Sequence, residues 1–203
     1  MNANWAQVMG TVFVGVVGLW VAHNYRRQIR LKLAERQVDA YTILWTTTGS
    51  ATPERTIPLD RDERQKLYDS MVDWYFHTGS GIFLPGDTRN LFVGVRSNLV
   101  CPIPSLKPAS LAEELSSLPE ADAERRRGCV VTRQVSLLRT QLKSDLDLHF
   151  GFNYYSTLRA DDRAFLKSCG ISPWRKPWRQ SVFRSSGRAG PNPCVCGSCR
   201  PLR

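Results

Sequence analysis

The sequence predicts an all-α protein, in which a single N-terminal transmembrane helix continues into a cytoplasmic helical bundle with a disordered basic C-terminal tail. Three observations predict this fold class. Ala6 to Ala22 is an uncharged apolar stretch, apolar residues recur at spacings of three and four through most of the chain, and no long run alternates between apolar and polar residues. The first is typical of a membrane-spanning helix, and the other two indicate helices without a sheet. We therefore expect an anchor over residues 1–25, a helical domain over 26–170 and a tail over 171–203.

The apolar stretch has aromatic residues at both ends and cations after it. Trp5 and Tyr25 bracket it, and the cations that follow are Arg26, Arg27, Arg30 and Lys32. A helix of about 17 residues reaches ~26 Å, at the lower end of what spans a bilayer. Cationic flanks stay on the cytoplasmic side, so we expect an inner or plasma membrane protein with its N-terminus outside. A cleaved signal peptide and a buried or interfacial helix are the alternatives, and the charge distribution favours the anchor.

Small residues recur on one face of this stretch. They are Thr11, Gly15, Gly18 and Ala22, at spacings of four, three and four. Such a face lets two helices approach closely, which predicts a homodimer through the anchor. The alternative is that glycine is simply common in membrane helices.

The first helix is expected to run on past the apolar stretch. From Tyr25 a stripe continues through Ala34, Val38, Tyr41 and Trp45, so we expect one helix ending near Thr48, with Gly49 as its stop.

A second helix is expected to begin at Asp60. Asp60 stands three residues before Glu63, which is capping-box spacing, and Gly79 and Gly81 end the helix. The apolar residues that share its face are Leu67, Met71, Trp74 and Tyr75.

Four further helices follow. One begins near Pro85 and carries Leu91, Phe92, Val95 and Leu99, and a short one lies within residues 102–119. A long helix over about 121–149 has Val131, Val135, Leu138, Leu142 and His149 on one stripe, and the last runs over about 160–169. We expect the first and the long helix to pack together as a bundle.

The formal net charge of +10 is concentrated in two segments. Residues 171–203 hold six Arg and one Lys without an acidic residue, and Arg26 to Arg36 contribute a net four more charges. The centre is close to neutral, so we expect no nucleic-acid partner and favour anionic lipid. The tail residues expected at the lipid surface are Trp174, Arg175, Lys176, Trp178 and Arg179; plain disorder and nucleic-acid stacking are the alternatives.

The candidate metal ligands are Cys194, Cys196 and Cys199, which form C-x-C-x-x-C. Three thiolates can hold zinc or copper or form a redox pair, but a fourth zinc ligand is missing nearby. Acylated cysteines and an inert tail remain alternatives.

No catalytic constellation stands out. Asp145 and His149 lie four residues apart, but a packed or capping histidine is favoured. We read Cys101, Cys129 and Cys169 as small core residues and the run Arg125 to Arg127 as a solvated helix face. Because no nucleotide, hydrolase or metalloprotease motif is present, we expect neither an enzyme nor a cofactor.

The order of these parts resembles bacterial single-pass membrane proteins that carry a cytoplasmic helical domain. The resemblance covers roughly residues 5–170 and is carried by Arg26, Ala34, Tyr41, Leu44 and Trp45, with Trp74 and Tyr75 in the next helix. It implies an architecture and no residue roles, and the cysteine-rich tail lies outside it.

The expected function is interaction or scaffolding at the inner face of a membrane. The partners would be the bilayer, a second copy through the anchor and a further protein. The alternative is a membrane-bound regulatory or sensory protein that uses the C-x-C-x-x-C tail for metal or redox chemistry, and an enzyme ranks third.

Overall fold

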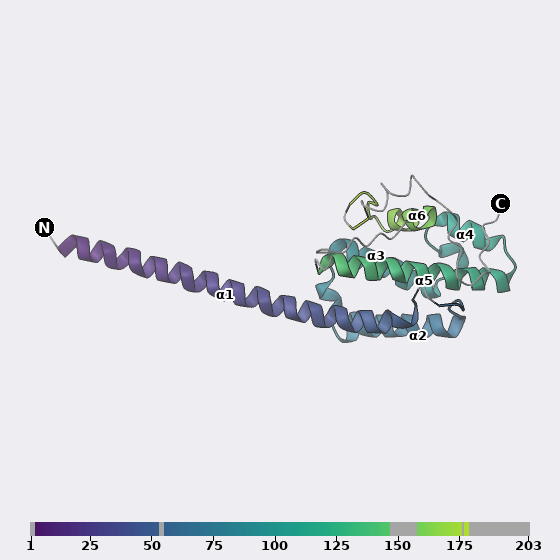
Figure 1. The fold of residues 1–203 in the computed structure, drawn as a ribbon, viewed down its shortest axis with the longest axis horizontal. Coiled ribbons are helices and arrows are strands. Elements are labelled where there is room, and N and C mark those ends of the chain that lie inside the picture. Colours follow the sequence, from purple (N-terminus) through teal and green to yellow (C-terminus); the bar gives the residue numbers. More distant parts are fainter. Residues whose placement is uncertain (1–2, 53–54, 147–157, 176, 179–203) are drawn as a thin grey trace. The chain divides into compact units, whose positions relative to one another are not determined.

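The computed structural model describes residues 3–52, 55–146, 158–175, 177 and 178, with the side chains of α1 described at Met9 and from Thr11 onward. In this part of the chain every regular element is helical and no strand occurs, which confirms the all-α class (Figure 1). The chain forms two compact units, residues 1–40 and 41–203, and each is described by itself. The predicted boundaries at residues 25 and 170 stay predictions.

Helix α1 (Ala3–Thr47) is continuous, as the sequence predicted. It passes into a 3-10 turn, η1 (Thr48–Ser50), which contains the predicted stop residue Gly49. At this end the Thr48 hydroxyl donates to the Leu44 carbonyl at 2.8 Å, and the Thr46 hydroxyl donates to the Ile43 carbonyl at 2.8 Å. Hydroxyl groups that return to the preceding turn are typical of places where a helix bends or ends.

The transmembrane anchor predicted over residues 1–25 is not supported. Within the part of the chain that the structure describes, no helix has an apolar stretch long enough to cross a membrane. Where side chains are described without a break, the uncharged stretch runs from Thr11 to Ala22, and His23, Arg26 and Arg27 follow it.

Helix α2 (Arg61–Val72) begins with the predicted capping box. The Glu63 N–H donates to Asp60 Oδ1 at 2.7 Å, and the Asp60 N–H donates to Glu63 Oε2 at 3.1 Å. Instead of continuing as an α-helix through Tyr75, the chain widens into a π-helical turn, η2 (Asp73–His77). Gly79, with a φ of 67°, ends this segment before the 3-10 turn η3 (Ser80–Phe83), because a left-handed backbone suits glycine.

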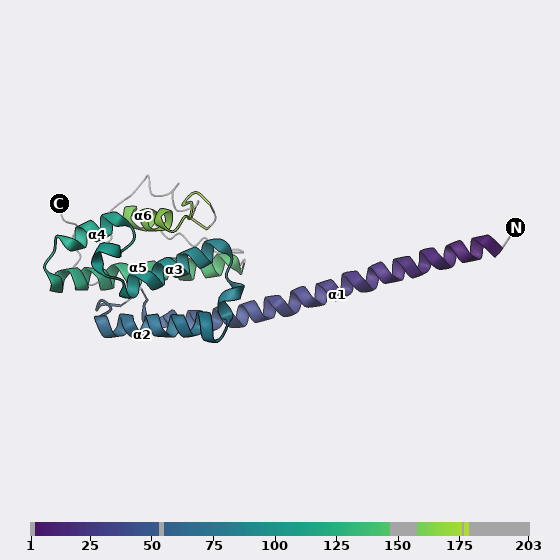
Figure 2. The same ribbon diagram turned by 180° about the vertical axis from the view of Figure 1, so that it is seen from behind.

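Helices α3 (Gly86–Val100) and α5 (Glu120–Asp145) form the centre of the second unit. Each presents a buried apolar stripe, which on α3 is Leu91, Phe92, Val95 and Leu99 and on α5 is Val131, Val135, Leu138 and Leu142. Helix α2 packs mainly on α3 and also contacts α5 (Figures 1 and 2). The expected pairing of the first with the long helix is seen at the C-terminal end of α1, where the Tyr41 hydroxyl donates to Asp145 of α5 at 3.0 Å and Arg139 of α5 lies over the Trp45 ring. The main partner of α5 is α3, because α3 also carries an unbroken buried stripe.

Two short helices complete this unit. Helix α4 (Ala109–Ser116) follows the 3-10 turn η4 (Ile103–Ser105) and builds a small apolar cluster with α5, formed by Leu106, Leu111, Ala112, Leu115 and Ala123. Helix α6 (Ala160–Ser168) packs on α5 and buries Phe165 and Leu166.

The first residues of the predicted tail belong to the core. Ile171 is 3% exposed and Trp178 is fully buried, although both lie in the segment predicted to be a disordered tail. The prediction followed the charge of this segment, but the indole of Trp178 brings a large apolar area into the core.

Candidate functional site

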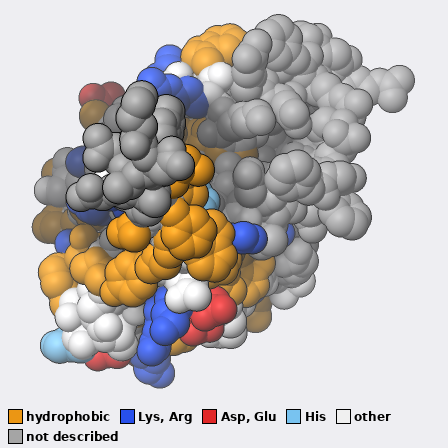
Figure 3. Space-filling model, turned by 90° about the vertical axis from the view of Figure 1, so that its left-hand side faces the viewer, with side chains coloured by type: hydrophobic (Ala, Val, Ile, Leu, Met, Phe, Trp, Pro, Cys, Tyr) orange, Lys and Arg blue, Asp and Glu red, His pale blue; other side chains and the backbone are white. Residues whose placement is uncertain are grey.

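The most unusual surface of the described chain is the apolar segment of α1 from Thr11 to Ala22. Phe13, Val14 and Leu19 are 69%, 70% and 74% exposed, and Val12, Val16 and Trp20 are also exposed. At about 100° per residue, neighbouring positions point to different sides, so apolar side chains surround the whole helix. Hydrophobic groups are prominent in the space-filling view of Figure 3. A helix that is apolar all round is normally one that is buried on every side.

The predicted anchor-face residues lie on this segment. Thr11, Gly15, Gly18 and Ala22 are all exposed. A Cβ atom added at Gly15 or Gly18 would meet nothing within 4 Å, so the described residues give these glycines no packing role. The homodimer through this face stays a prediction.

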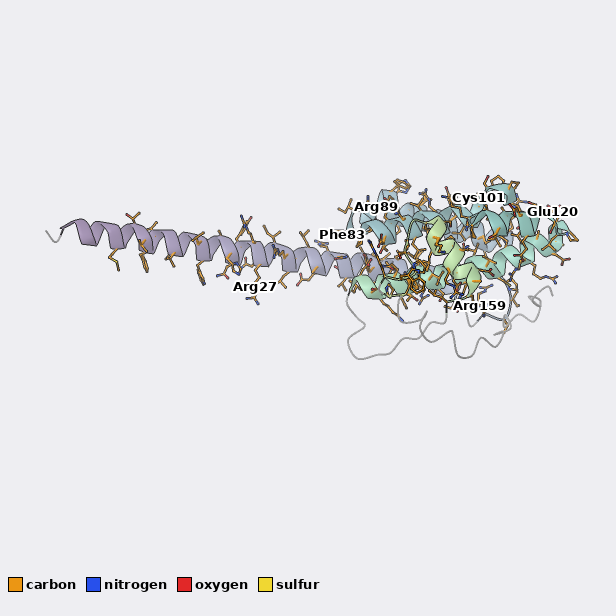
Figure 4. All side chains as sticks on the ribbon, turned by 90° about the horizontal axis from the view of Figure 1, so that it is seen from above. Arg27, Phe83, Arg89, Cys101, Glu120 and Arg159 are labelled. Carbon is orange, nitrogen blue, oxygen red and sulfur yellow. The ribbon has the colours of Figure 1, made fainter. Side chains whose placement is uncertain are left out.

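A cationic section of α1 follows the apolar segment. Arg26, Arg27 and Arg30 are exposed, as is Lys32, and the Arg27 side chain extends outward from the helix in Figure 4. Among the described residues none of these cations takes part in an ion pair. Arg26, Arg27 and Arg30 therefore form a positive surface directly after an apolar one.

The second unit exposes an apolar surface of its own, which we call the Phe76 surface: Phe76, Val93, Arg96 and Val100. Phe76 is 59% exposed, and Arg96 lies 5.7 Å from the centre of its ring. Beneath it, Tyr75 contacts Phe76 edge-on with ring centres 4.7 Å apart and stacks on Phe92 at 5.1 Å. The π-helical turn η2 holds Phe76 outward while Trp74 is buried, and such turns are frequent at functional sites.

The predicted lipid-contact residues of the tail divide into three groups. Trp174 is 59% exposed and Arg175 is exposed, as a surface role requires. Trp178 is fully buried and cannot contact lipid from this position, which corrects its assignment. Lys176 and Arg179 lie outside the described residues.

The predicted metal ligands Cys194, Cys196 and Cys199 also lie outside the described residues. Within the described ranges, no group of three or more histidine, cysteine or acidic side chains is placed to hold a metal ion.

Asp145 has a structural role at the junction of three helices. Its carboxylate accepts hydrogen bonds from the Tyr41 hydroxyl at 3.0 Å, the Thr88 hydroxyl at 2.5 Å and the Gln141 amide at 3.1 Å. His149, its predicted neighbour, lies outside the described residues. A carboxylate that already accepts three hydrogen bonds serves packing better than proton transfer.

Two of the described cysteines, Cys101 and Cys169, are poor nucleophiles. Burial raises the pKa of the Cys101 thiol and of the Cys169 thiol, so both stay protonated at neutral pH. Cys101 lies directly after α3, as labelled in Figure 4. His77 is exposed and contacts the Asp73 carboxylate at 3.0 Å.

Arg127 is a buried cation. It was expected on a solvated face, yet it is 5% exposed and donates to the Asn98 carbonyl at 2.9 and 3.1 Å and to the Cys101 carbonyl at 2.7 Å. Burial lowers its pKa, and so does the nearby Arg64 guanidinium. A signal was present: Arg127 lies four residues before Val131, on the same stripe as the buried residues of α5.

Comparison with known protein families, with curated proteins and with solved structures found no match. The function is therefore inferred from three surfaces of the described chain. These are the apolar segment of α1, the cations that follow it and the Phe76 surface.

Proposed function

We propose that this protein is an interaction or scaffolding protein that attaches to a lipid bilayer through the apolar segment of α1 and binds a protein partner through the Phe76 surface. The observation that carries the proposal is the exposure of apolar side chains on all sides of one helix. It does not require that α1 cross the bilayer.

Lipid accounts for this exposure better than a protein partner does. A protein groove covers the one apolar face of an amphipathic helix, whereas acyl chains can surround the whole helix. Burying a Val, Leu or Phe side chain is worth about 1.5–3 kcal/mol. The segment exposes several such side chains, including Phe13, Val14 and Leu19, so insertion would be strongly favourable.

The Phe76 surface supports the interaction role. It joins exposed apolar side chains to one cation, Arg96, which is the composition of a protein-binding patch with a polar rim. Aromatic and arginine side chains are enriched where binding energy concentrates. The predicted location of this unit on the cytoplasmic side of an inner membrane stays a prediction, as does the alternative of a cysteine-based sensor.

Vesicle flotation tests lipid attachment. We expect the full-length protein to float with neutral phosphatidylcholine vesicles, and the double variant Phe13→Asp/Leu19→Asp to stay behind, since two carboxylates would have to enter apolar surroundings. The control is Ile82→Asp, which changes a side chain that is 78% exposed in the second unit and should float like the wild type. Circular dichroism checks that all three proteins are folded.

The two possible failures are distinct. A wild-type protein that does not float, or a double variant that floats equally well, contradicts lipid attachment. For the interaction role, Phe76→Asp should abolish crosslinking to a co-purified partner without affecting flotation. An unchanged crosslinking pattern would contradict the proposed role of the Phe76 surface.

A further inference from the structure

We infer that α1 recognises anionic phospholipid through one face formed by Arg26, Arg27 and Arg30, here called the arginine face. The inference rests on the proposed lipid attachment and adds the class of headgroup. It also makes these three arginines, and not the whole basic stretch, responsible for that recognition.

Helical geometry groups the three arginines. At about 100° per residue, Arg30 lies ~40° and Arg27 ~100° around the helix from Arg26. His23 falls within the same arc, and no acidic residue between 23 and 37 does. All three arginines are exposed, so their positive charges add on one side of α1.

The remaining cations of α1 are in a different setting. Lys32 and Arg36 lie on the opposite side of the helix, where they share an arc of about 100° with Glu35 and Asp39. Two acidic side chains there offset two basic ones. A negative membrane surface would therefore attract this side of the helix little, although Lys32 and Arg36 are as many cations as Arg26 and Arg30.

Position along the helix separates the two sets further. Arg26 follows Ala22, the end of the apolar segment, by about 6 Å, and Arg30 lies ~6 Å beyond Arg26. Arg36 is ~9 Å farther still, close to the screening length of about 8 Å at physiological salt. If the apolar segment is in the acyl region, the arginine face lies at the level of the phosphates.

The chemistry of the side chains fits a phosphate ligand. A guanidinium presents its N–H groups as a planar fork that matches two phosphate oxygens. Phosphatidylglycerol carries a net negative charge, whereas the phosphate of phosphatidylcholine is compensated by its own choline. The arginine face thus predicts a preference for the anionic lipid beyond the insertion of the apolar segment.

The test compares two variants that each remove two cations from the full-length protein, Arg26→Gln/Arg30→Gln and Lys32→Gln/Arg36→Gln. Binding is measured by flotation against phosphatidylcholine vesicles with and without phosphatidylglycerol. A basic residue near an anionic surface contributes enough that losing two should weaken binding to the mixed vesicles about 30-fold. The Lys32/Arg36 variant should lose less than about threefold, because these two cations lie farther along the helix from the apolar segment and on its other side.

The outcomes distinguish this inference from the proposed function. Equal losses in the two variants would show a response to net charge alone and overturn the arginine face, as would no loss in either. Binding of the wild type to neutral vesicles without gain from phosphatidylglycerol would overturn the inference and leave lipid attachment intact. Duplex DNA that displaces the wild type from mixed vesicles at physiological salt would also overturn it.

Discussion

Replacing Arg127 with methionine should destabilise the second unit more than its sequence neighbourhood suggests. The Arg127 guanidinium donates three hydrogen bonds, two to the Asn98 carbonyl and one to the Cys101 carbonyl, at the C-terminal end of α3. The helical partner of the Asn98 carbonyl would be the N–H of residue 102, but that residue is Pro102. Arg127 therefore supplies the donor that the proline lacks.

The magnitude follows from the two carbonyls that would be left without this donor. A buried polar group without a partner costs about 1–3 kcal/mol, so two of them give roughly 4 kcal/mol. Removing the repulsion between Arg127 and Arg64, which lowers the pKa of Arg127, returns part of this. We expect Arg127→Met to lower the free energy of unfolding by about 3 kcal/mol, which corresponds to a fall in Tm of roughly 6–12 °C.

Urea unfolding followed by circular dichroism measures the effect, and the adjacent residue provides a matched control. Arg126 is partly exposed and pairs with Glu114 at 3.0 Å. Arg126→Met lies in the same helix and introduces the same side chain, but a surface ion pair is worth at most about 1 kcal/mol. The reasoning is refuted if the two variants differ by less than about 1 kcal/mol, because burial would then add nothing to the role of Arg127.

Three further predictions concern close contacts and the buried thiols. A Cβ at Gly94 would lie 2.5 Å from Cys169 Sγ, so Gly94→Ala should lower the free energy of unfolding by about 1–3 kcal/mol. The double variant Gly94→Ala/Cys169→Ala should recover part of this loss. Strictly additive losses in a double-mutant cycle would refute the contact. Gly128→Ala should cost more, because its Cβ would lie 2.3 Å from the backbone carbonyl of Leu59, which cannot rotate away; thermal unfolding that ranks it below Gly94→Ala would contradict this. Burial raises the pKa of Cys101 and Cys169 above 9.0, so the folded thiols should react with iodoacetamide more slowly at pH 8 than those of the denatured chain. The contribution of these thiols to stability is complete below pH 9.0 and is lost as the pH rises through the folded pKa, because the unfolded thiols ionise first. Equal iodoacetamide labelling of the folded and denatured chains, measured by peptide mass spectrometry, would contradict the raised pKa.

Local rules predicted most of the helices. The capping box at Asp60 and Glu63, the entry of α3 at Pro85 and the buried stripe of α5 each depend on residues close together in sequence. The π-helical turn η2 could not be predicted in this way. It adds a residue to the helical turn, and in this turn Trp74 is buried while Phe76 stays exposed. The contacts that stabilise this turn are made with other parts of the fold, and the local sequence does not specify them.

The pairing of helices was beyond the reach of the periodicity argument. Val131, Val135, Leu138 and Leu142 show that α5 has a partner, but an apolar stripe fits any other stripe of similar width. Long-range polar contacts help to distinguish the partners here. Asn98 of α3 donates to Gln134 of α5 at 2.9 Å, and both side chains are buried. Burying these two amides without their hydrogen bond would be costly, so the pair favours the one helix register in which they meet.

Charge alone gave wrong predictions of side-chain exposure where the position of a residue on its helix was not considered. Arg127 was expected on a solvated helix face and Trp178 at the lipid surface, and both are buried. Helical position also distinguishes the cations of α1. Arg26 and Arg30 lie on one side of the helix and Lys32 and Arg36 on the other, although all four are exposed. The side of the helix decides which acidic neighbours a cation has, and therefore how much of its charge reaches a ligand. A count of basic residues predicts that the two pairs contribute equally to lipid binding, whereas their helical positions predict that Arg26 and Arg30 dominate.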